Sequence, residues 1–447
     1  MTLDPSVFKA YDVRGIYPTE LDEDGGYRVG RAYVETFEPR RIAAGRDMRL
    51  SSPSMATAVM EGALDAGANV VDVGMIGTEM LYFAVGSLDL DGGIMVTASH
   101  NPKEYTGMKI VRRGALPVGG DSGLLDIKRR AEASFAGVSS RGAIHEEDVY
   151  PAWVERVLAF VDADAIRPLK VVIDAANGMA GRMLPPVLDR LPVDADRCFF
   201  EPDGSFPNHE PNPLLAENRQ FLVARVLEQQ ADLGIAFDGD ADRCFFVDDT
   251  GEFVPGDFLT ALLAQTILSK NPGGRVLYDV RASWAVPDTI ETAGGEALVN
   301  RVGHAFFKQR MRREGAVFGG EVSGHYYFRD FFQADSGVVP MLLLLELASR
   351  AGKRLSEILA PFRERYFLTG EINTPVADVP LKLQELKDRF GQEGQVSHLD
   401  GISVTARDWH MNVRPSNTEP LLRLNLEARS HELMERKRDE VLALIHA

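Results

Sequence analysis

Residues 41–75 read RIAAGRDMRLSSPSMATAVMEGALDAGANVVDVGM, and this stretch decides the fold class. A short apolar run, RIAAG, precedes the helical stretch PSMATAVMEGALDAG, and a second apolar run, NVVDVG, follows it. Proline near the start of the helical stretch is typical of a first helical turn, and Gly67 is typical of a C-cap. Strand–helix–strand alternation of this kind favours a layered α/β architecture.

The same alternation recurs and divides the chain into four segments. Residues 1–147 add the apolar runs GGIMVTA and GMKIV, and residues 148–253 contain KVVIDAANGMAG and DLGIAF. Residues 254–365 run from GDFLTALLAQTILSK to MLLLLELA, which is too short to span a bilayer and is typical of a buried helix. Residues 366–447 alternate strands with a polar loop and end in the helical HELMERKRDEVLALIHA. The sequence predicts three α/β domains followed by a smaller α+β domain.

Composition limits the class of protein. The 447 residues are 45% hydrophobic and 26% charged, which is typical of a globular protein. A net charge of −17 argues against a general nucleic-acid binder, although a local cationic pocket remains compatible with it. Two cysteines exclude a disulfide framework and a cysteine-based zinc site. Without an apolar signal core or an 18-residue apolar run, we expect a soluble cytoplasmic protein.

The segment DGDADR, residues 238–243, is the sharpest chemical signal. Asp238, Asp240 and Asp242 alternate between the apolar runs DLGIAF and CFFVDD. Carboxylates this close repel unless a positive group lies between them, and oxygen ligands suit Mg²⁺, Ca²⁺ or Mn²⁺. An EF-hand is excluded because Arg243 and Asp249 stand where it needs Gly and Glu. A solvated acidic turn is the plain alternative. DADRCFF also occurs at residues 194–200, which we interpret as a chance repeat.

A second signal is TASHNP, residues 97–102, after the apolar run GGIMV. Ser99 is predicted at a strand-to-loop corner, beside His100 and Asn101. An exposed serine there can act as nucleophile or phosphoryl carrier if a base or metal activates it. Alone the signal is weak, because Ser, Asn and Pro also form plain turns. Lys109 follows ten residues later, and Arg14 lies near the N-terminus in FKAYDVRG.

The segment GEVSGH, residues 320–325, alternates polar with small or apolar residues. An extended backbone would point Glu321, Ser323 and His325 the same way, as partners for sugar hydroxyls. A half-buried polar strand end is the alternative.

The segment RPSNTEP, residues 414–420, lies between two alternating strands. Arg414 can fork onto a phosphate, while Ser416, Asn417 and Thr418 add neutral donors. Alone it is better explained as a surface hairpin turn. One site for phosphoryl transfer to a sugar would need all four segments: a carrier hydroxyl, a divalent ion, a sugar-reading surface and a phosphate anchor.

In this order and over the whole chain, FKAYDVRG, TASHNP, DGDADR, GEVSGH and RPSNTEP resemble the α-D-phosphohexomutase superfamily, and most closely its phosphomannomutase/phosphoglucomutase branch. The resemblance implies four domains around a central cleft. Residues 1–147 would carry the phosphoserine loop, 148–253 the metal-binding loop, 254–365 the sugar-binding loop and 366–447 the phosphate-binding loop.

The resemblance also implies roles for individual residues. Ser99 would be the phosphoserine and would bind Mg²⁺ together with Asp238, Asp240 and Asp242. Glu321, Ser323 and His325 would bind sugar hydroxyls, and Arg414, Ser416, Asn417 and Thr418 the non-reacting phosphate. The further active-site positions that match are Tyr11, Arg14, His100, Lys109, Arg243 and His304.

The implied reaction is a reversible transfer between C6 and C1 of a hexose phosphate, through a 1,6-bisphosphate that turns end over end. Glucose or mannose 1,6-bisphosphate would serve as activator, because it rephosphorylates Ser99 when the intermediate escapes. The expected partners are small hexose phosphates, without nucleic acid or membrane.

Some positions depart from the branch. Val322 replaces the usual Met, and Arg281 stands where Lys is frequent, so Arg281 is left out of the predicted site. His325 without the Gln typical of phosphoglucosamine mutases favours mannose or glucose substrates. Phosphoglucosamine mutase, a phosphatase and an inactive sugar-phosphate-binding homologue are the alternatives.

Overall fold

The computed structural model describes residues 3–135, 137, 140–416 and 421–447. The chain forms two compact units. The first contains Met1–Phe253 and His325–Arg354, and the second contains Val254–Gly324 and Leu355–Ala447.

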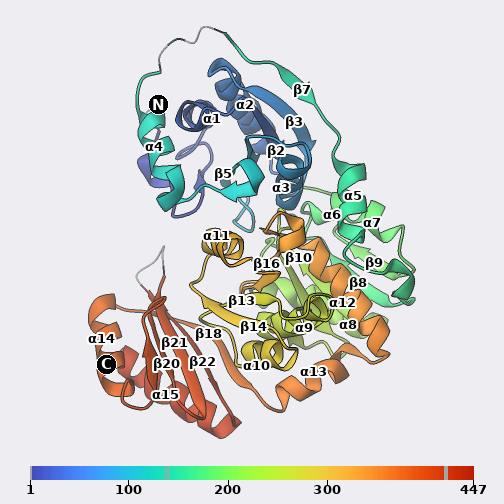
Figure 1. Ribbon diagram of the computed structural model, residues 1–447, viewed down its shortest axis with the longest axis vertical. Coiled ribbons are helices and arrows are strands. Elements are labelled where there is room, and N and C mark those ends of the chain that lie inside the picture. Colours follow the sequence, from blue (N-terminus) through green and yellow to red (C-terminus); the bar gives the residue numbers. More distant parts are fainter. Residues whose placement is uncertain (1–2, 136, 138–139, 417–420) are drawn as a thin grey trace. The chain divides into compact units, whose positions relative to one another are not determined.

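The first unit begins with a seven-stranded mixed sheet of order β1-β5-β4-β2-β3-β7, with β6 beside β5 (Figure 1). Its parallel strands β2, β3 and β4 confirm the strand–helix–strand alternation expected from residues 41–75. The strands are β1 (Val13–Ile16), β2 (Arg41–Arg46), β3 (Asn69–Met75), β4 (Gly92–Val96), β5 (Tyr105–Arg112), β6 (Leu116–Pro117) and β7 (Ile144–Glu146). The helices are α1 (Glu23–Phe37), α2 (Ser52–Asp65), α3 (Thr78–Ser87) and α4 (Leu125–Glu132).

Helices α1 and α2 lie side by side (Figure 1) because two glycines let their backbones approach closely. A Cβ atom on Gly30 would stand 2.1 Å from the carbonyl oxygen of Val59, and one on Gly62 would stand 2.0 Å from that of Tyr27. Gly67 was predicted as the C-cap of this helix, but the C-cap of α2 is Ala66. Gly67, with φ +94°, is the next residue. That is the position at which a left-handed residue commonly ends a helix.

A second sheet in the first unit has the order β12-β11-β10-β8-β9. Every residue of β10 and β11 is buried, and these two strands pair antiparallel, whereas β10 and β8 run parallel. The first copy of DADRCFF starts in the edge strand β9 rather than between two buried strands. The strands are β8 (Lys170–Asp174), β9 (Asp194–Cys198), β10 (Leu233–Phe237), β11 (Cys244–Asp248) and β12 (Phe253–Val254).

Helices α5 (Tyr150–Leu158), α6 (Ala180–Met183), α7 (Pro185–Leu188) and α8 (Gln220–Gln229) accompany this sheet in the chain. The rest of the first unit is the antiparallel pair β16 (Tyr326–Phe328) and β17 (Ala334–Asp335), followed by α12 (Val338–Ala351). Helix α12 contains MLLLLELA, and most of its residues are buried, as predicted.

In the second unit, β13 (Arg275–Asp279) pairs in parallel with β14 (Glu296–Asn300) and β15 (Phe318–Gly320). Its helices are α9 (Gly256–Lys270), α10 (Ala285–Thr292), α11 (His304–Glu314) and α13 (Leu355–Arg363). An antiparallel sheet of order β18-β22-β21-β20-β19 follows, with helices α14 (Val379–Phe390) and α15 (His431–His446). Its strands are β18 (Phe367–Pro375), β19 (Gln395–Ser397), β20 (Ile402–Thr405), β21 (Trp409–Pro415) and β22 (Leu421–Ala428). The change from parallel α/β to antiparallel α+β structure confirms the predicted order of fold types.

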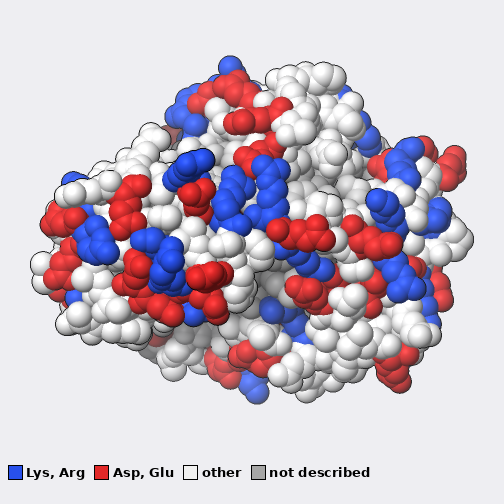
Figure 2. Space-filling model, turned by 90° about the horizontal axis from the view of Figure 1, so that it is seen from below, with Lys and Arg blue, Asp and Glu red and all other residues white. Residues whose placement is uncertain are grey.

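Acidic and basic side chains are interspersed over the face drawn in Figure 2, despite the net charge of −17. Within the described ranges, every helix is too short or too polar to cross a membrane.

Candidate functional site

Three carboxylates converge in the loop between the buried strands β10 and β11. Asp238, Asp240 and Asp242 are at most 1% exposed, and each can place one ligand oxygen within 4.8 Å of the other two. The antiparallel pairing of Phe237 with Cys244 closes this loop. The alternation of aspartates in the sequence therefore corresponds to a compact, buried cluster and not to a solvated turn.

Two cations of the chain itself neutralise part of this cluster. Lys109 on β5 donates its Nζ to Asp240 Oδ2 at 2.7 Å and also contacts Asp242. Arg243 Nη2 lies 2.8 Å from Asp238 Oδ2. Thr78 Oγ1 donates to Asp240 Oδ2 at 2.5 Å. Part of the positive charge expected between these carboxylates thus comes from Lys109, which is distant along the chain, and from Arg243, which ends the same loop.

The electrostatics differ between the carboxylates. Burial raises the pKa of Asp238 to about 7, although Arg243 acts in the opposite direction. Burial and Asp242 also act to raise the pKa of Asp240, but Lys109 and Thr78 outweigh them and hold it below its ordinary value. Although burial opposes it, the carboxylates Asp240 and Asp242 raise the pKa of Lys109, so this amine is protonated at neutral pH.

The donor set fits a hard divalent cation. The candidate ligands are carboxylate oxygens, which suit Mg²⁺, Ca²⁺ or Mn²⁺. Asp240 Oδ1 is buried and accepts no hydrogen bond from the part of the chain that the structure describes. A buried acceptor without a donor is costly, and a bound cation would satisfy it.

Ser99 lies beside this cluster, at the predicted corner after β4. Its Oγ donates to Asp238 Oδ2 at 2.9 Å and lies 3.3 Å from His100 Nδ1. Its backbone has φ +51°, in the left-handed region that few non-glycine residues adopt. Burial and the nearby Arg243 and Arg14 hold the pKa of His100 well below its ordinary value, so this imidazole is neutral near pH 7.

Arg14 and Tyr11 lie in or just before β1, which is an edge strand of the first sheet. Arg14 lies on β1, opposite Gly107 of β5, and its guanidinium donates to Asp12 and to the side chain of Asn101. Tyr11 lies just before β1 and is half-buried. Arg14 is therefore connected directly to the loop that contains Ser99.

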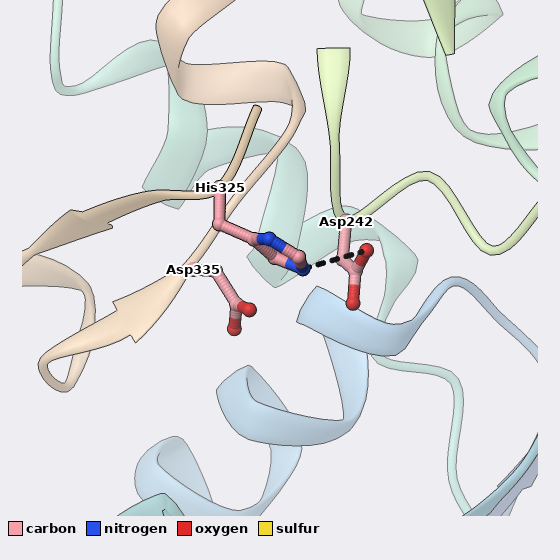
Figure 3. A group of neighbouring side chains, drawn as sticks. All are labelled: Asp242, His325 and Asp335. Atoms are coloured by element: carbon pink, nitrogen blue, oxygen red, sulfur yellow. Dashed lines mark ion pairs between the residues drawn. The ribbon is translucent and has the colours of Figure 1, made fainter. Parts of the chain in front are cut away.

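His325 also points toward Asp242, as Figure 3 shows. Its Nε2 lies 3.9 Å from Asp242 Oδ1, and Asp335 can bring a third ligand atom within 4.8 Å of both. No sequence motif singles out Asp335, which becomes part of this group only because β17 pairs with β16.

The extended conformation predicted for GEVSGH is wrong. Residues 321–325 form a turn between β15 and β16, and Gly324 has φ +85°. Glu321 and Ser323 contact each other within the second unit, where Ser323 Oγ donates to Glu321 Oε2 at 3.0 Å. An alternation of polar residues in a six-residue segment does not distinguish a strand from a turn, and the left-handed glycine decides for the turn.

Arg414 belongs to a cluster of three guanidinium groups in the second unit. Glu371 lies 3.6 Å from Arg414, 3.5 Å from Arg281 and 2.7 Å from Arg423. Arg281 also donates to Asp279 at 2.7 Å, and Asp279 accepts from the backbone of Val322. Arg281, Arg423 and Glu371 are absent from the site predicted from the sequence. The one sequence signal for Arg423 is its polar position in the alternating strand LLRLNLEA.

Two further predicted residues belong to the second unit. His304 begins α11, directly after Gly303, which has φ +127°. Ser416 follows β21 and is half-buried. Asn417 and Thr418 lie outside the described residues. The roles assigned to all these residues stay predictions.

Comparisons with known proteins cover nearly the whole chain. Models described as "Phosphoglucomutase/phosphomannomutase, alpha/beta/alpha domain" I, II and III match residues 5–134, 151–251 and 255–366, and the model of the C-terminal domain matches residues 371–444. A phosphomannomutase of Salmonella montevideo is 44% identical, over 98% of this chain and 99% of that protein. A protein named "Phosphohexose mutases" from Xanthomonas campestris is also 44% identical, over 98% of each chain.

Solved structures agree with these sequence matches. A phosphoglucomutase/phosphomannomutase family protein from Burkholderia thailandensis has a TM-score of 0.88 and 33% identity, over 99% of this chain and 97% of that one. The three α/β domains and the C-terminal domain are those of its fold. The chain therefore belongs to the phosphoglucomutase/phosphomannomutase family.

Proposed function

We propose that this chain is a phosphohexomutase, an intramolecular phosphotransferase that interconverts hexose 6-phosphate and hexose 1-phosphate. The observation that carries the proposal is the contact of Ser99 Oγ with Asp238 Oδ2 at 2.9 Å, within a buried cluster that also contains Lys109 and Arg243. A hydroxyl held among carboxylates and cations is suited to carry a phosphoryl group. The family and the names of its full-length relatives support the same reaction.

In the proposed mechanism, phospho-Ser99 transfers its phosphoryl group to the free hydroxyl of the sugar phosphate. The resulting hexose 1,6-bisphosphate turns around and returns its other phosphate to Ser99. A phosphoserine has nearly two negative charges at neutral pH, and Lys109 and Arg243 compensate part of that charge. The neutral His100 can accept the hydroxyl proton, and the protonated Lys109 can return one. His304 is a further candidate for this proton transfer.

We propose that Asp238, Asp240 and Asp242 hold Mg²⁺ together with an oxygen of phospho-Ser99. When bound, Mg²⁺ would stabilise the negative charge of the transferred group. The three aspartates supply the buried oxygen donors, and Lys109 and Arg243 limit their mutual repulsion before the metal binds. Dependence on Mg²⁺ is tested by adding EDTA, which should abolish turnover, and then restoring the metal.

We assign the substrate's other contacts to two groups of residues. Glu321, Ser323 and His325 would bind the sugar hydroxyls. Arg414 and Ser416, together with Asn417 and Thr418, would bind the phosphate that does not react. Because the intermediate presents either end, this second group must accept a phosphate on C1 or on C6. A hexose 1,6-bisphosphate added in trace amounts would restore phospho-Ser99 and act as activator.

The decisive test is Ser99→Ala. Since alanine cannot accept a phosphoryl group, turnover of hexose 1-phosphate should fall at least about 10³-fold, with an unchanged thermal midpoint. Intact mass should show phosphate on the wild-type protein treated with hexose 1,6-bisphosphate, and none on the variant. Ser54→Ala, at an exposed position of α2, is the matched control and should keep both properties. Wild-type turnover in Ser99→Ala would refute the assignment.

Substrate preference is measured as kcat/KM for mannose 1-phosphate, glucose 1-phosphate and glucosamine 1-phosphate. Comparable values for mannose and glucose would indicate a dual-specificity enzyme. A hundredfold preference corresponds to about 2.7 kcal/mol in transition-state binding and would identify a specialist. A preference for the glucosamine substrate would identify a phosphoglucosamine mutase, and release of inorganic phosphate in proportion to turnover would identify a phosphatase.

A further inference from the structure

Arg49 is a buried residue that donates hydrogen bonds to the Ser99 loop, which we define as residues 97–105. It follows β2 in the segment GRDMR, and its side chain is 0% exposed. Its Nη2 donates to the carbonyl oxygens of Ser99 at 2.8 Å and Asn101 at 2.6 Å. Its Nη1 donates to those of Pro102 at 2.8 Å and Tyr105 at 3.2 Å. One guanidinium therefore binds four carbonyls of a single loop.

The guanidinium is itself held from two sides. Asp47 Oδ2 lies 3.4 Å from Arg49 Nε, and Asp47 Oδ1 accepts from the Arg49 amide at 3.0 Å and from the Ser52 hydroxyl. The ring of Phe206 lies 5.1 Å from the Arg49 Cζ, within the range of a cation–π contact. These contacts orient the planar group, so its donors are directed at the Ser99 loop before any substrate binds.

The hydrogen bonds from Arg49 matter for Ser99 because the serine backbone is in an unfavourable, left-handed conformation. A left-handed conformation is unfavourable at a non-glycine residue and persists only where its surroundings enforce it. The hydrogen bond from Arg49 to the Ser99 carbonyl holds the peptide that follows Ser99, and the Ser99 amide donates to Thr97 Oγ1 at 2.9 Å. With both flanking peptides fixed, the side chain of Ser99 is directed at Asp238.

We infer that Arg49 is a positioning residue for the phosphoryl-transfer step, which keeps the Ser99 hydroxyl against the carboxylate cluster through the four carbonyls of its loop. The inference rests on the proposed function, because it concerns the carrier role of Ser99. Arginine is required because its planar fork of donors reaches several acceptors at once, whereas the compact ammonium of lysine cannot reproduce that geometry.

The test compares full-length Arg49→Lys with the wild type. Misplacing a reacting group by about 1 Å can cost about a hundredfold in rate, so we expect kcat to fall by about that factor while KM stays within about threefold. The rate at which a hexose 1,6-bisphosphate phosphorylates Ser99, followed by intact mass, should fall in parallel with kcat. The amides of Asn101 and Tyr105, which donate inside this loop, should exchange with deuterium faster.

Arg31→Lys is the matched control, because Arg31 is a buried arginine of the same sheet-and-helix region that pairs with Glu35 on its own helix. It should keep wild-type kcat, phosphorylation rate and loop exchange. If Arg49→Lys does not fold, Phe206→Leu removes only the ring next to the guanidinium, and we expect a smaller loss of kcat with faster exchange in the Ser99 loop. The inference would be overturned if folded Arg49→Lys showed wild-type kcat and wild-type deuterium exchange in the Ser99 loop. If Arg49→Lys does not fold, the same result for Phe206→Leu would overturn it.

Phosphorylation of the wild-type protein distinguishes a failure of the carrier role of Ser99 from a failure of the positioning role of Arg49. Absence of phosphate on wild-type Ser99 would refute the carrier role itself. Phosphorylated wild type together with unchanged Arg49→Lys kinetics would refute only the positioning role.

Discussion

At the scale of single residues, Lys109 and the three aspartates form a charge balance within a buried site. Lys109 contacts two of the carboxylates, which themselves are almost completely buried. Removing one partner of a buried ion pair leaves an uncompensated charge, and this typically costs about 3–5 kcal/mol. A divalent cation in the same cluster would supply the missing positive charge.

We therefore expect Lys109→Met to lower the thermal midpoint much more in EDTA than in excess Mg²⁺. The measurement is thermal unfolding of wild type and variant under both conditions. Arg113→Met, which removes an exposed pair with Asp89 and Asp91, should leave the thermal midpoint nearly unchanged under either condition. An equal loss for Lys109→Met in EDTA and Mg²⁺ would contradict metal binding at this cluster.

Gly239 provides a second test at residue scale, because it lies between the Ser99 loop and the carboxylates. A Cβ atom there would stand 2.5 Å from the Ser99 carbonyl oxygen, closer than any real contact permits. Gly239→Ala should displace the Ser99 loop, costing about 1–3 kcal/mol and most of the turnover. Denaturant titration and steady-state kinetics check both effects. In Gly119→Ala the new Cβ has its nearest neighbour at 3.4 Å, so wild-type behaviour is expected.

At the scale of elements, Glu79 connects three helices near the site. Its carboxylate accepts from Trp153 Nε1 on α5 at 2.9 Å, and from Ser336 Oγ and the amides of Gly337 and Val338 at the start of α12. Burial raises its pKa to about 7, against the effect of these donors. The carboxylate also lies where the positive end of a helix dipole favours negative charge.

Glu79→Gln places an amide NH₂ among hydrogen-bond donors. One buried donor then has no acceptor, so we expect a loss of about 1–3 kcal/mol in the free energy of unfolding. Urea titration measures this loss. Glu155→Gln, on the exposed surface of α5, should cost under about 1 kcal/mol. A Glu79→Gln variant as stable as its control would show that α12 does not depend on this carboxylate.

At the scale of the whole molecule, stability should depend on pH through two buried acids of the second unit. Asp257 accepts from the Ser283 amide at 3.0 Å, and Glu427 accepts from the Ser283 hydroxyl at 2.7 Å. Burial raises the pKa of Asp257 from 3.8 to about 7 and that of Glu427 from 4.5 to about 7. An acid with a raised pKa in the folded state stabilises the fold while it is protonated, and this contribution is lost as pH rises through that pKa.

These two acids should therefore lower the wild-type thermal midpoint as pH rises from about 4 to about 7. Glu427→Gln removes one of the two titrating groups, so the midpoint should fall less steeply over this range, by a few degrees at the upper end. Glu432→Gln, at an exposed position in the first turn of α15, should leave the pH dependence unchanged. Identical pH profiles of wild type and Glu427→Gln would contradict a raised pKa at this position.

The sequence by itself determined the features that depend on short stretches of chain. Alternating apolar and helical segments predicted β2, α2 and β3, and a turn sequence after an apolar run predicted the corner at Ser99. The acidic trio between two apolar runs predicted the cluster in the β10–β11 loop. Periodicity and turn chemistry are local properties, so a single sequence contains them.

Only the tertiary structure decided which distant side chains complete the site. Lys109 reaches Asp242 across 133 residues of chain, and Arg423 reaches Glu371 across 52. No local pattern contains these pairings. The first joins two different sheets of the first unit, and the second depends on the pairing of β18 with β22. The turn at GEVSGH was mispredicted for a different reason: its polar alternation fits a strand, but the left-handed Gly324 favours a turn. Local sequence motifs thus predicted the candidate groups, and the tertiary structure determined which distant side chains contact them.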